Sequence, residues 1–264
     1  MVGKLQGKKA LVTGAGTGIG REVALEFSRQ GAAVMLHYAG SREGAETAAA
    51  ECIAGGGRAF VCQADLGRPE ECFRLVDCAA DALGGLDILV NNAGVTETRS
   101  FLDVTPEDFD RLYHINIRGQ FFCAQRGARH MLARGGGVVI NVTSVHALVA
   151  LPRHSVYAGA KGAICAWTRE LAIELAPAIR VNALAPGWVE VPRHHADPHF
   201  DPQRAGLAVP MQRLGQPLDV AKACVYLASD DSAWMTGHVL VLDGGTTAWM
   251  SLRAGGRAEQ RDER

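Results

Sequence analysis

The sequence predicts an α/β fold, in which a parallel β-sheet lies between layers of helices. Two observations lead to this prediction: short apolar runs alternate with helical patterns along most of the 264 residues, and a glycine-rich turn joins the first run to the first helical pattern. Strands that are almost continuously apolar, with helices between them, are typical of parallel sheets covered on both faces. We expect seven strands, at residues 10–12, 33–38, 59–63, 88–91, 138–142, 180–185 and 239–242.

A glycine-rich turn, Thr-Gly-Ala-Gly-Thr-Gly-Ile-Gly at residues 13–20, follows the first strand and begins a helix. Glycines allow the chain to turn sharply and to approach a pyrophosphate closely, and the first free N–H groups of the helix attract its negative charge. The glycine spacing differs by one position from the Gly-x-Gly-x-x-Gly pattern of other dinucleotide-binding proteins. The turn therefore predicts a dinucleotide site, with contacts from Gly14, Thr17, Gly18, Ile19 and Gly20.

A tyrosine and a lysine stand one helical turn apart in the segment Tyr157-Ala-Gly-Ala-Lys161, and Ser144 precedes the tyrosine by 13 residues. The i,i+4 spacing places both side chains on one helix face. A nearby positive charge favours a phenolate, so we expect Lys161 to lower the pKa of Tyr157 from its usual value of ~10. Such a tyrosine can exchange a proton with an alcohol. The alternative is an ordinary amphipathic helix that carries the two residues by chance.

Two further segments follow from local patterns. Thr105-Pro-Glu-Asp108 predicts an N-cap with proline at the first helical position, and this helix carries Asn116. Residues 190–215 hold four prolines and three histidines and are too long for a simple connection, which predicts a substrate lid. We expect one domain over residues 1–252 and a charged tail, 253–264, that is partly disordered.

Composition excludes several other classes of protein. The net charge of -1 and the pI of about 6.8 give no basic surface for nucleic acid. No run approaches the ~18 apolar residues of a membrane span and residues 1–9 are too polar for a signal peptide, so we expect a cytoplasmic protein without membrane contact. The 7 cysteines include no Cys-x-x-Cys pair, and the lid histidines lack carboxylate or cysteine partners. We therefore predict neither a disulfide framework nor a metal site.

The set of motifs resembles the short-chain dehydrogenase/reductase family over nearly the whole chain. The matching features, in family order, are the turn at 13–20, Asn91-Asn92-Ala93-Gly94, Asn116, Ser144, Tyr157, Lys161, Pro186-Gly187 and Asp243-Gly244-Gly245. The resemblance implies a Rossmann-type, doubly wound, seven-stranded parallel sheet in three α/β/α layers. It also implies a nicotinamide cofactor, a small alcohol or carbonyl substrate, and a homotetramer.

The resemblance also assigns a catalytic set. Tyr157 is the general acid/base, and Ser144 bonds the substrate oxygen. Lys161 also bonds the hydroxyls of the nicotinamide ribose, and Asn116 holds a water beside this lysine. A simple bend in the helix is the alternative, compatible role for Asn116. An alternative from another functional class is a cofactor-sensing protein that has kept the fold and lost catalysis. The presence of all four catalytic residues argues against this alternative.

Cofactor contacts are implied after the later strands. Asp65 and Leu66 match the pair that faces adenine, although Asp65 is alternatively a helix cap. Asn92, Ala93 and Gly94 match the segment beside the adenosine ribose, and Pro186, Gly187 and Val189 match the segment along the carboxamide. The family commonly has threonine five positions after the proline, whereas this sequence has Val191, so one hydroxyl contact is missing.

The end of the second strand favours NADP(H), with NAD(H) still possible. An acidic residue there bonds the 2′-hydroxyl of NAD and repels a 2′-phosphate. The aligned residue is Tyr38, which is not acidic, and Ser41 and Arg42 follow. Arginine suits phosphate because of its forked donors. The alternative for Arg42 is a solvated charge at the start of a helix.

The substrate prediction rests on looser similarities. Ser144-Val145-His146, the lid segments and the chain beyond Gly245 resemble glucose 1-dehydrogenases, so we expect an aldose 1-dehydrogenase with substrate contacts from His146, Tyr157, Trp188 and His194. Trp249 and Met250 would then close the site. A reductase of 3-oxoacyl thioesters or other ketones is the alternative.

Overall fold

The computed structural model describes residues 3–249, so the predicted tail at 253–264 and Met250 lie outside the described residues. Seven parallel strands form one sheet in the order β3-β2-β1-β4-β5-β6-β7. They are β1 (Lys9–Val12), β2 (Ala33–Tyr38), β3 (Ala59–Gln63), β4 (Ile88–Asn91), β5 (Gly137–Val142), β6 (Ile179–Pro186) and β7 (Val239–Leu242). Each predicted strand is confirmed to within one residue at either end.

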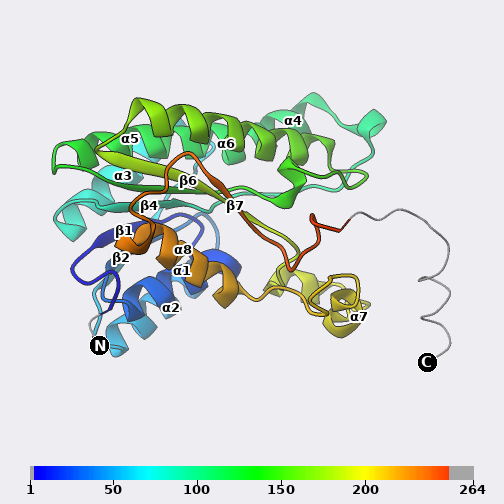
Figure 1. The fold of residues 1–264 in the computed structure, drawn as a ribbon, viewed down its shortest axis with the longest axis horizontal. Helices are drawn as coiled ribbons and strands as arrows, with labels where there is room; N and C mark the ends of the chain where they lie inside the picture. The colour runs from blue at the N-terminus through cyan, green and yellow to red at the C-terminus, as the bar shows by residue number, and fades with distance from the viewer. Residues whose placement is uncertain (1–2, 250–264) are drawn as a thin grey trace.

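Helices cover both faces of the sheet, which confirms the doubly wound, three-layer architecture (Figure 1). One face carries α1 (Gly18–Arg29), α2 (Arg42–Ala54) and α8 (Pro217–Ala228). The other carries α3 (Pro69–Leu83), α5 (Gln120–Leu132) and α6 (Ser155–Glu174), with α4 (Pro106–Tyr113) ahead of α5.

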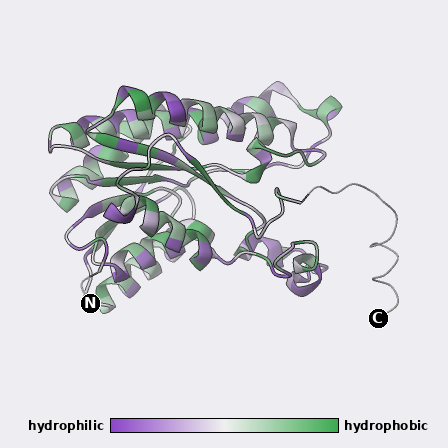
Figure 2. Ribbon diagram, viewed as in Figure 1, coloured by the Kyte–Doolittle hydropathy of each residue, from purple (hydrophilic) through white to green (hydrophobic). Residues whose placement is uncertain are grey.

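Successive side chains along each strand point to opposite faces of the sheet, so the hydrophobic core consists of two clusters. Val12 of β1 packs in the cluster under α1 and α8, whereas its neighbour Leu11 packs in the cluster under α3 and α5. Successive side chains of a strand point to opposite faces, so a strand buried on both faces has to be apolar throughout. Apolar residues accordingly colour the strands and the inner sides of the helices in Figure 2. Within residues 3–249, no helix is both long and apolar enough to span a membrane.

The strand order reverses between β1 and β4, and this reversal positions the site. In such sheets, ligands bind in the crevice at the carboxyl ends of the strands on either side of the reversal. The glycine turn follows β1, Asn92 follows β4, and Ser144 follows β5. The chain therefore brings its predicted functional residues to one edge of the sheet.

The helix predicted from residue 105 begins as expected but contains an irregular turn. Thr105 and Asp108 form a reciprocal capping box at the start of α4. Residues His114–Gly119, here called η2, then form a π-helical turn before α5. Such turns often occur at functional sites, and this one carries Asn116.

The predicted lid is built from short helical turns rather than open loop. It contains η4 (Pro192–Ala196) and α7 (Pro202–Gly206). Its last part packs on the segment after β7, where the Met211 N–H donates to the Gly244 carbonyl over 3.2 Å. The lid and the chain beyond β7 are therefore in contact.

Candidate active site

The glycine turn presents unpartnered backbone donors at the start of α1. Gly14 and Gly18 have φ of +67° and +55°, which side chains rarely tolerate. Thr17 caps α1 without a side-chain hydrogen bond, and the first turn contains no acidic residue. The first N–H groups of α1 therefore lack a protein partner, and this end of the helix fits an anion such as a pyrophosphate.

Buried hydrogen bonds hold this turn against the loop after β4. The Thr13 hydroxyl accepts from the N–H groups of Asn92 and Ala93, each over 3.0 Å. The Asn92 amide donates to the Thr13 carbonyl over 2.9 Å. The side chain of Asn92 therefore braces the turn, and Thr13, which the sequence did not single out as a contact residue, is central to the bracing.

The region predicted to hold the adenosine lies at the ends of β2 and β3. Tyr38 is buried and Ser41 packs against Gly16, where a methyl group would lie 2.1 Å from the Ser41 Oγ. Arg42 is exposed at the start of α2, and its Nε donates to Glu46 over 2.8 Å. Arg42 therefore already has a carboxylate partner, and a bound phosphate would share the guanidinium with Glu46.

Asp65 and Leu66 follow β3, but not in the manner of a helix cap. The Asp65 carboxylate accepts from the Gly67 N–H over 2.9 Å, whereas the N-cap of α3 is Arg68. The helix-cap alternative for Asp65 is therefore wrong. Leu66 is buried in the core, so its backbone rather than its side chain is available to a ligand.

Asn116 is fixed on the π-helical turn by two hydrogen bonds to one residue. Its Oδ1 accepts from the Val95 N–H over 2.7 Å, and its Nδ2 donates to the Val95 carbonyl over 2.8 Å. A Cβ added to Gly94 would lie 3.0 Å from Asn116 Oδ1 and 3.7 Å from Lys161 Nζ. Gly94 thus leaves a small space between the asparagine and the lysine, and Asn116 lies on the helix bend that the sequence analysis gave as its compatible role.

Lys161 is fully buried on α6 and donates from Nζ to the Val142 carbonyl over 2.9 Å. Burial lowers the pKa of Lys161 to about 8. The one carbonyl partner satisfies only part of the ammonium, which has three donors. Further acceptors, such as the hydroxyls of a ribose, suit the remaining donors.

Tyr157 lies one turn before Lys161 on α6, with the lysine Nζ 5.6 Å from its ring centre. The prediction that Lys161 lowers the pKa of this tyrosine is wrong. Burial raises the pKa of Tyr157, and it outweighs a hydrogen bond with Ser144 and the charge of Arg193, which both act in the opposite direction. The Lys161 ammonium is directed to a backbone carbonyl, and the phenol of Tyr157 stays protonated at neutral pH.

Arg193 is a lid residue that the sequence did not indicate. It is exposed on η4, and its charge acts on the Tyr157 phenol and on His194, whose pKa it lowers together with burial. In the sequence, Arg193 is recognisable only as a positively charged residue within the predicted lid. An arginine in such a loop is usually solvated, which is why it was overlooked.

The substrate side is rich in aromatic rings. His146 stands edge-on to Tyr157 with ring centres 5.3 Å apart, and its Nδ1 is buried without a partner. The rings of Trp188, His194 and Phe200 form a cluster at the lid. Their centres are 6.5 Å apart for Trp188–His194, 6.4 Å for Trp188–Phe200 and 5.3 Å for His194–Phe200. Trp188 is half exposed. Leu148, Val149 and Leu151, all exposed, lie in the loop between Ser144 and Tyr157.

The segment after β6 leads from the sheet into the lid. Pro186 ends β6, and a side chain at Gly187 would clash with Asp243 at 2.8 Å. Val189 is buried and pairs with Gly215 across the base of the lid. Val191 stands where the family has threonine, and its Cγ1 lies 3.2 Å from the position of a Cβ on Gly18. The missing hydroxyl is thus replaced by apolar packing onto the glycine turn.

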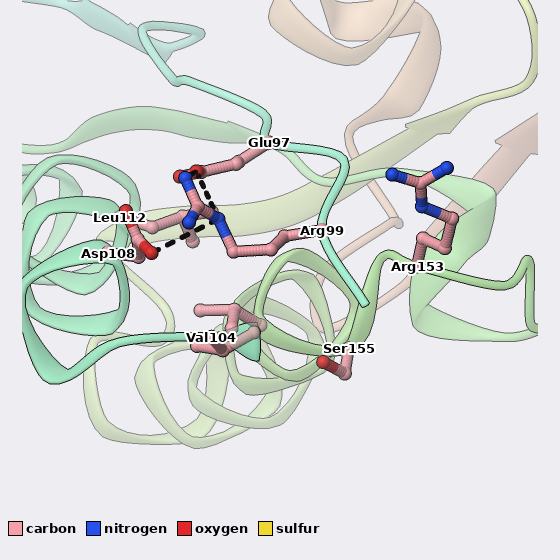
Figure 3. Close-up of a pocket in the computed structure, with 8 residues that line it drawn as sticks. Glu97, Arg99, Val104, Asp108, Leu112, Arg153 and Ser155 are labelled. Carbon is pink, nitrogen blue, oxygen red and sulfur yellow. Dashed lines mark hydrogen bonds and ion pairs between the residues drawn. The ribbon is translucent and has the colours of Figure 1, made fainter. Parts of the chain in front are cut away.

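A small cavity lies beside the start of α6, lined by residues of the loop after β4, of α4 and of α6 (Figure 3). Its volume of about 10 Å³ accommodates no more than a single water. Arg99 bridges Glu97 and Asp108 there, and its N–H donates to the Arg153 carbonyl over 2.9 Å. This network fastens the loop after β4 to α4 and to the segment that precedes α6.

The rings of two lid histidines have protein partners, and the expectation that these histidines lack a carboxylate partner is wrong for one of them. His195 Nε2 lies 2.9 Å from the Glu190 carboxylate, and His194 Nδ1 accepts from the Val191 N–H. Between residues 3 and 249, no group of three or more His, Cys, Asp or Glu side chains is arranged to hold a metal ion.

The reversal in strand order, the anion-binding turn and the Ser144–Tyr157–Lys161 group together define a dinucleotide-dependent oxidoreductase. A family model described as enoyl-(acyl carrier protein) reductase matches residues 14–247. Versicolorin reductase from Emericella nidulans is 41% identical over 92% of this chain and 96% of its own length. Tetrahydroxynaphthalene reductase from Pyricularia oryzae is 40% identical over 91% of this chain and 90% of its own.

A solved structure agrees with these relatives. A short-chain dehydrogenase from Burkholderia cenocepacia, in complex with NADP, is 37% identical and covers 92% of this chain and 99% of its own, with a TM-score of 0.86. The chain therefore belongs to the short-chain dehydrogenase/reductase family. It is an oxidoreductase that acts on a CH–OH group or on the corresponding carbonyl.

Proposed function

We propose that this protein is an NADP(H)-linked reductase of a ketone carried on a flat, largely apolar ring system. The observation that carries the proposal is a set of aromatic and apolar side chains: Trp188 and Phe200, which contact each other, and the exposed Leu148 and Leu151 in the loop before α6. Flat rings pack well on such surfaces. The names of the two fungal relatives also describe reductases of fused aromatic ring compounds.

The geometry supports proton donation by Tyr157. A bound nicotinamide supplies hydride to the carbonyl carbon. Tyr157, kept protonated by burial, donates its proton to the carbonyl oxygen, which Ser144 holds by a second hydrogen bond. In its protonated form Tyr157 is ready to donate a proton, as the reduction of a carbonyl requires.

Lys161, one turn after Tyr157 on α6, and Asn116 on η2 support this proton transfer. The ammonium of Lys161 would hold the ribose of the cofactor through the donors that Val142 leaves free. The space beside Gly94, between Asn116 and Lys161, suits a water that returns a proton to Tyr157. Arg193 adds a positive charge that favours the phenolate.

The cofactor preference rests on the end of β2. No carboxylate stands at Tyr38 to repel a 2′-phosphate, and Ser41 and Arg42 lie beside the glycine turn at the start of α2. The neighbour from Burkholderia cenocepacia was solved with NADP. We therefore favour NADP(H), with NAD(H) as the weaker cofactor.

Oxidation of an aldose remains the second candidate, and one observation favours it. His146 and His194 provide polar nitrogen atoms beside Tyr157 and Trp188, which could bond sugar hydroxyls. Reduction of a 3-oxoacyl thioester would instead use the exposed apolar loop at 148–151 for the acyl chain.

A substrate panel separates these candidates. Hydroxylated bicyclic ketones, aldoses and 3-oxoacyl thioesters are each mixed with the protein and NADPH, NADH or their oxidised forms, and nicotinamide absorbance is followed. We expect the fastest turnover with NADPH and the bicyclic ketones. Turnover of an aldose or thioester without any ketone reduction would refute the proposal.

We also propose a homotetramer in a reducing, cytoplasmic environment. On α8 and its neighbourhood, Leu218 and Tyr226 are partly exposed and Trp234 is fully exposed, as expected for a surface covered by another subunit. All 7 cysteines are free thiols. Sedimentation that gives a monomer mass at every concentration would refute the assembly.

A further inference from the structure

His37 is a buried histidine on β2 whose two ring nitrogens both bond to backbone. Its Nδ1 accepts from the Gly14 N–H over 3.0 Å, and its Nε2 lies 3.0 Å from the Ala64 carbonyl. A carbonyl can only accept, so Nε2 carries the proton and Nδ1 is the acceptor. One neutral tautomer satisfies both contacts, and the side chain is only 1% exposed.

The backbone around His37 strengthens the same connections. The Ala15 N–H donates to the His37 carbonyl over 2.7 Å, and the Ala64 N–H donates to the Tyr38 carbonyl over 3.1 Å. Three segments are therefore tied together: the glycine turn after β1, the end of β2, and the end of β3 that leads to Asp65. These segments surround the predicted adenosine side of the cofactor.

The environment keeps the ring uncharged. Burial lowers the pKa of His37 to about 4, and the charge of Arg74 on α3 lowers it as well, against a hydrogen bond to Ala64 that raises it. A second ring proton would point at the Gly14 N–H, so the contact with the glycine turn exists only in the neutral form.

We propose that His37 is a positioning residue for the cofactor: it fixes the glycine turn relative to the adenosine-binding ends of β2 and β3. The residue acts through Gly14 and Ala64 and touches no reacting atom. The glycine turn and the ends of β2 and β3 would contact the portion of the cofactor that is common to NAD(H) and NADP(H). Loss of His37 should therefore weaken the binding of both cofactors equally. The inference rests on the proposed cofactor use.

Three variants separate the two contacts. His37→Leu removes both, His37→Asn keeps an acceptor near the position of Nδ1, and His37→Gln keeps a donor near the position of Nε2. The dissociation constants of NADPH and NADH are measured by fluorescence titration, together with thermal unfolding and kcat at saturating cofactor. Met35→Ala, at another buried position on β2, controls for general loss of stability.

We expect His37→Leu to weaken NADPH and NADH by a similar factor of roughly ten or more, because a buried N–H without a partner is costly. The kcat at saturation should stay within about twofold, because the residues that move the proton are untouched. His37→Asn should recover more affinity than His37→Gln, because it restores the partner of Gly14.

Two results would overturn the inference. One is a folded His37→Leu variant that binds both cofactors as tightly as the wild type. The other is an equal loss of affinity in Met35→Ala at a matched loss of thermal stability, which would assign the effect to general destabilisation. If the wild type itself bound neither cofactor, the proposed function would fail first.

Discussion

The cofactor side and the substrate side of this molecule are held in different ways. Around the glycine turn, the side chains of Thr13, His37 and Asn92 are tied to backbone by buried and partly buried hydrogen bonds. The lid is instead held by aromatic contacts around Phe200 and by partly exposed polar pairs such as Glu190–His195. Buried bonds fix a geometry that one kind of cofactor requires, whereas ring contacts can repack around different substrates. We propose that the first region fixes the cofactor and that the lid chooses the substrate.

The largest expected effect comes from Tyr157→Phe, which tests where the chemistry lies. Removal of the phenol should lower kcat by ~10² to 10⁴, because a general acid contributes about that factor. Affinity for NADPH should stay nearly unchanged. Stopped-flow turnover and fluorescence titration check the two parts. A variant that kept more than a tenth of wild-type turnover, with chemistry as the slow step, would exclude Tyr157 as the proton donor.

The pH dependence of stability tests the buried bonds of the cofactor side. The pKa of His37 is lowered to about 4 in the folded protein, so the unfolded chain binds the proton more readily. Stability from this residue is therefore complete above ~6.5, the pKa of an unfolded histidine, and is lost as the pH falls towards 4. The difference amounts to roughly 3 kcal/mol for a shift of this size.

Urea unfolding of the wild type and His37→Asn at several pH values measures this term. The wild type should lose more stability than the variant between neutral pH and pH ~4. Parallel curves for the two proteins would mean that His37 does not titrate in this way.

Gly94→Ala tests the space between Asn116 and Lys161. The added methyl would lie 3.0 Å from Asn116 Oδ1, which is close enough to displace the side chain without unfolding the protein. We expect kcat to fall roughly tenfold with the fold intact, which is less than the ~10² to 10⁴ expected for loss of the general acid itself. Gly162→Ala on α6 is the control, because its added Cβ meets nothing within 4 Å. Equal kcat in both variants would exclude a role for this space.

Arg42→Ala should have a smaller and more selective effect. If Arg42 binds the 2′-phosphate, its removal raises KM for NADPH several-fold, about the value of one exposed charge contact, and leaves KM for NADH unchanged. Glu46→Ala is the matched variant: loss of the competing carboxylate should leave Arg42 free for the phosphate and lower KM for NADPH. Equal changes for both cofactors in Arg42→Ala would return this arginine to the role of a solvated charge.

The sequence predicted the strands and the glycine turn well because their determinants are local. The strands are apolar on both faces, and the glycine turn and the Tyr157–Lys161 spacing depend on neighbours in the chain. His37 escaped notice because a single histidine in an apolar strand gives no sign of its distant partners, Gly14 and Ala64. The π-helical turn depends on the contact of Asn116 with Val95, and the pKa of Tyr157 depends on burial; neither is visible in a sequence pattern.

The substrate side was predicted less well because its determinants are spatial. The lid was expected from its length and prolines, but the ring cluster around Phe200 joins residues from three separate turns. The sugar-dehydrogenase resemblance indicated His146, Trp188 and His194 but gave no role to Phe200, which contacts Trp188 and His194. Arg193 was missed because its reach towards Tyr157 appears only once the lid is folded.

The most direct test of the claim that the lid chooses the substrate while the other region fixes the cofactor is the substrate selectivity of Phe200→Ala. The measured quantity is the ratio of kcat/KM for a hydroxylated bicyclic ketone to kcat/KM for a small aliphatic ketone, with NADPH as cofactor. The account predicts that the ratio falls up to about tenfold, the value of a lost aromatic contact, while the affinity for NADPH stays constant. An unchanged ratio, or an equal loss on both ketones, would contradict the claim that the lid rings choose the substrate.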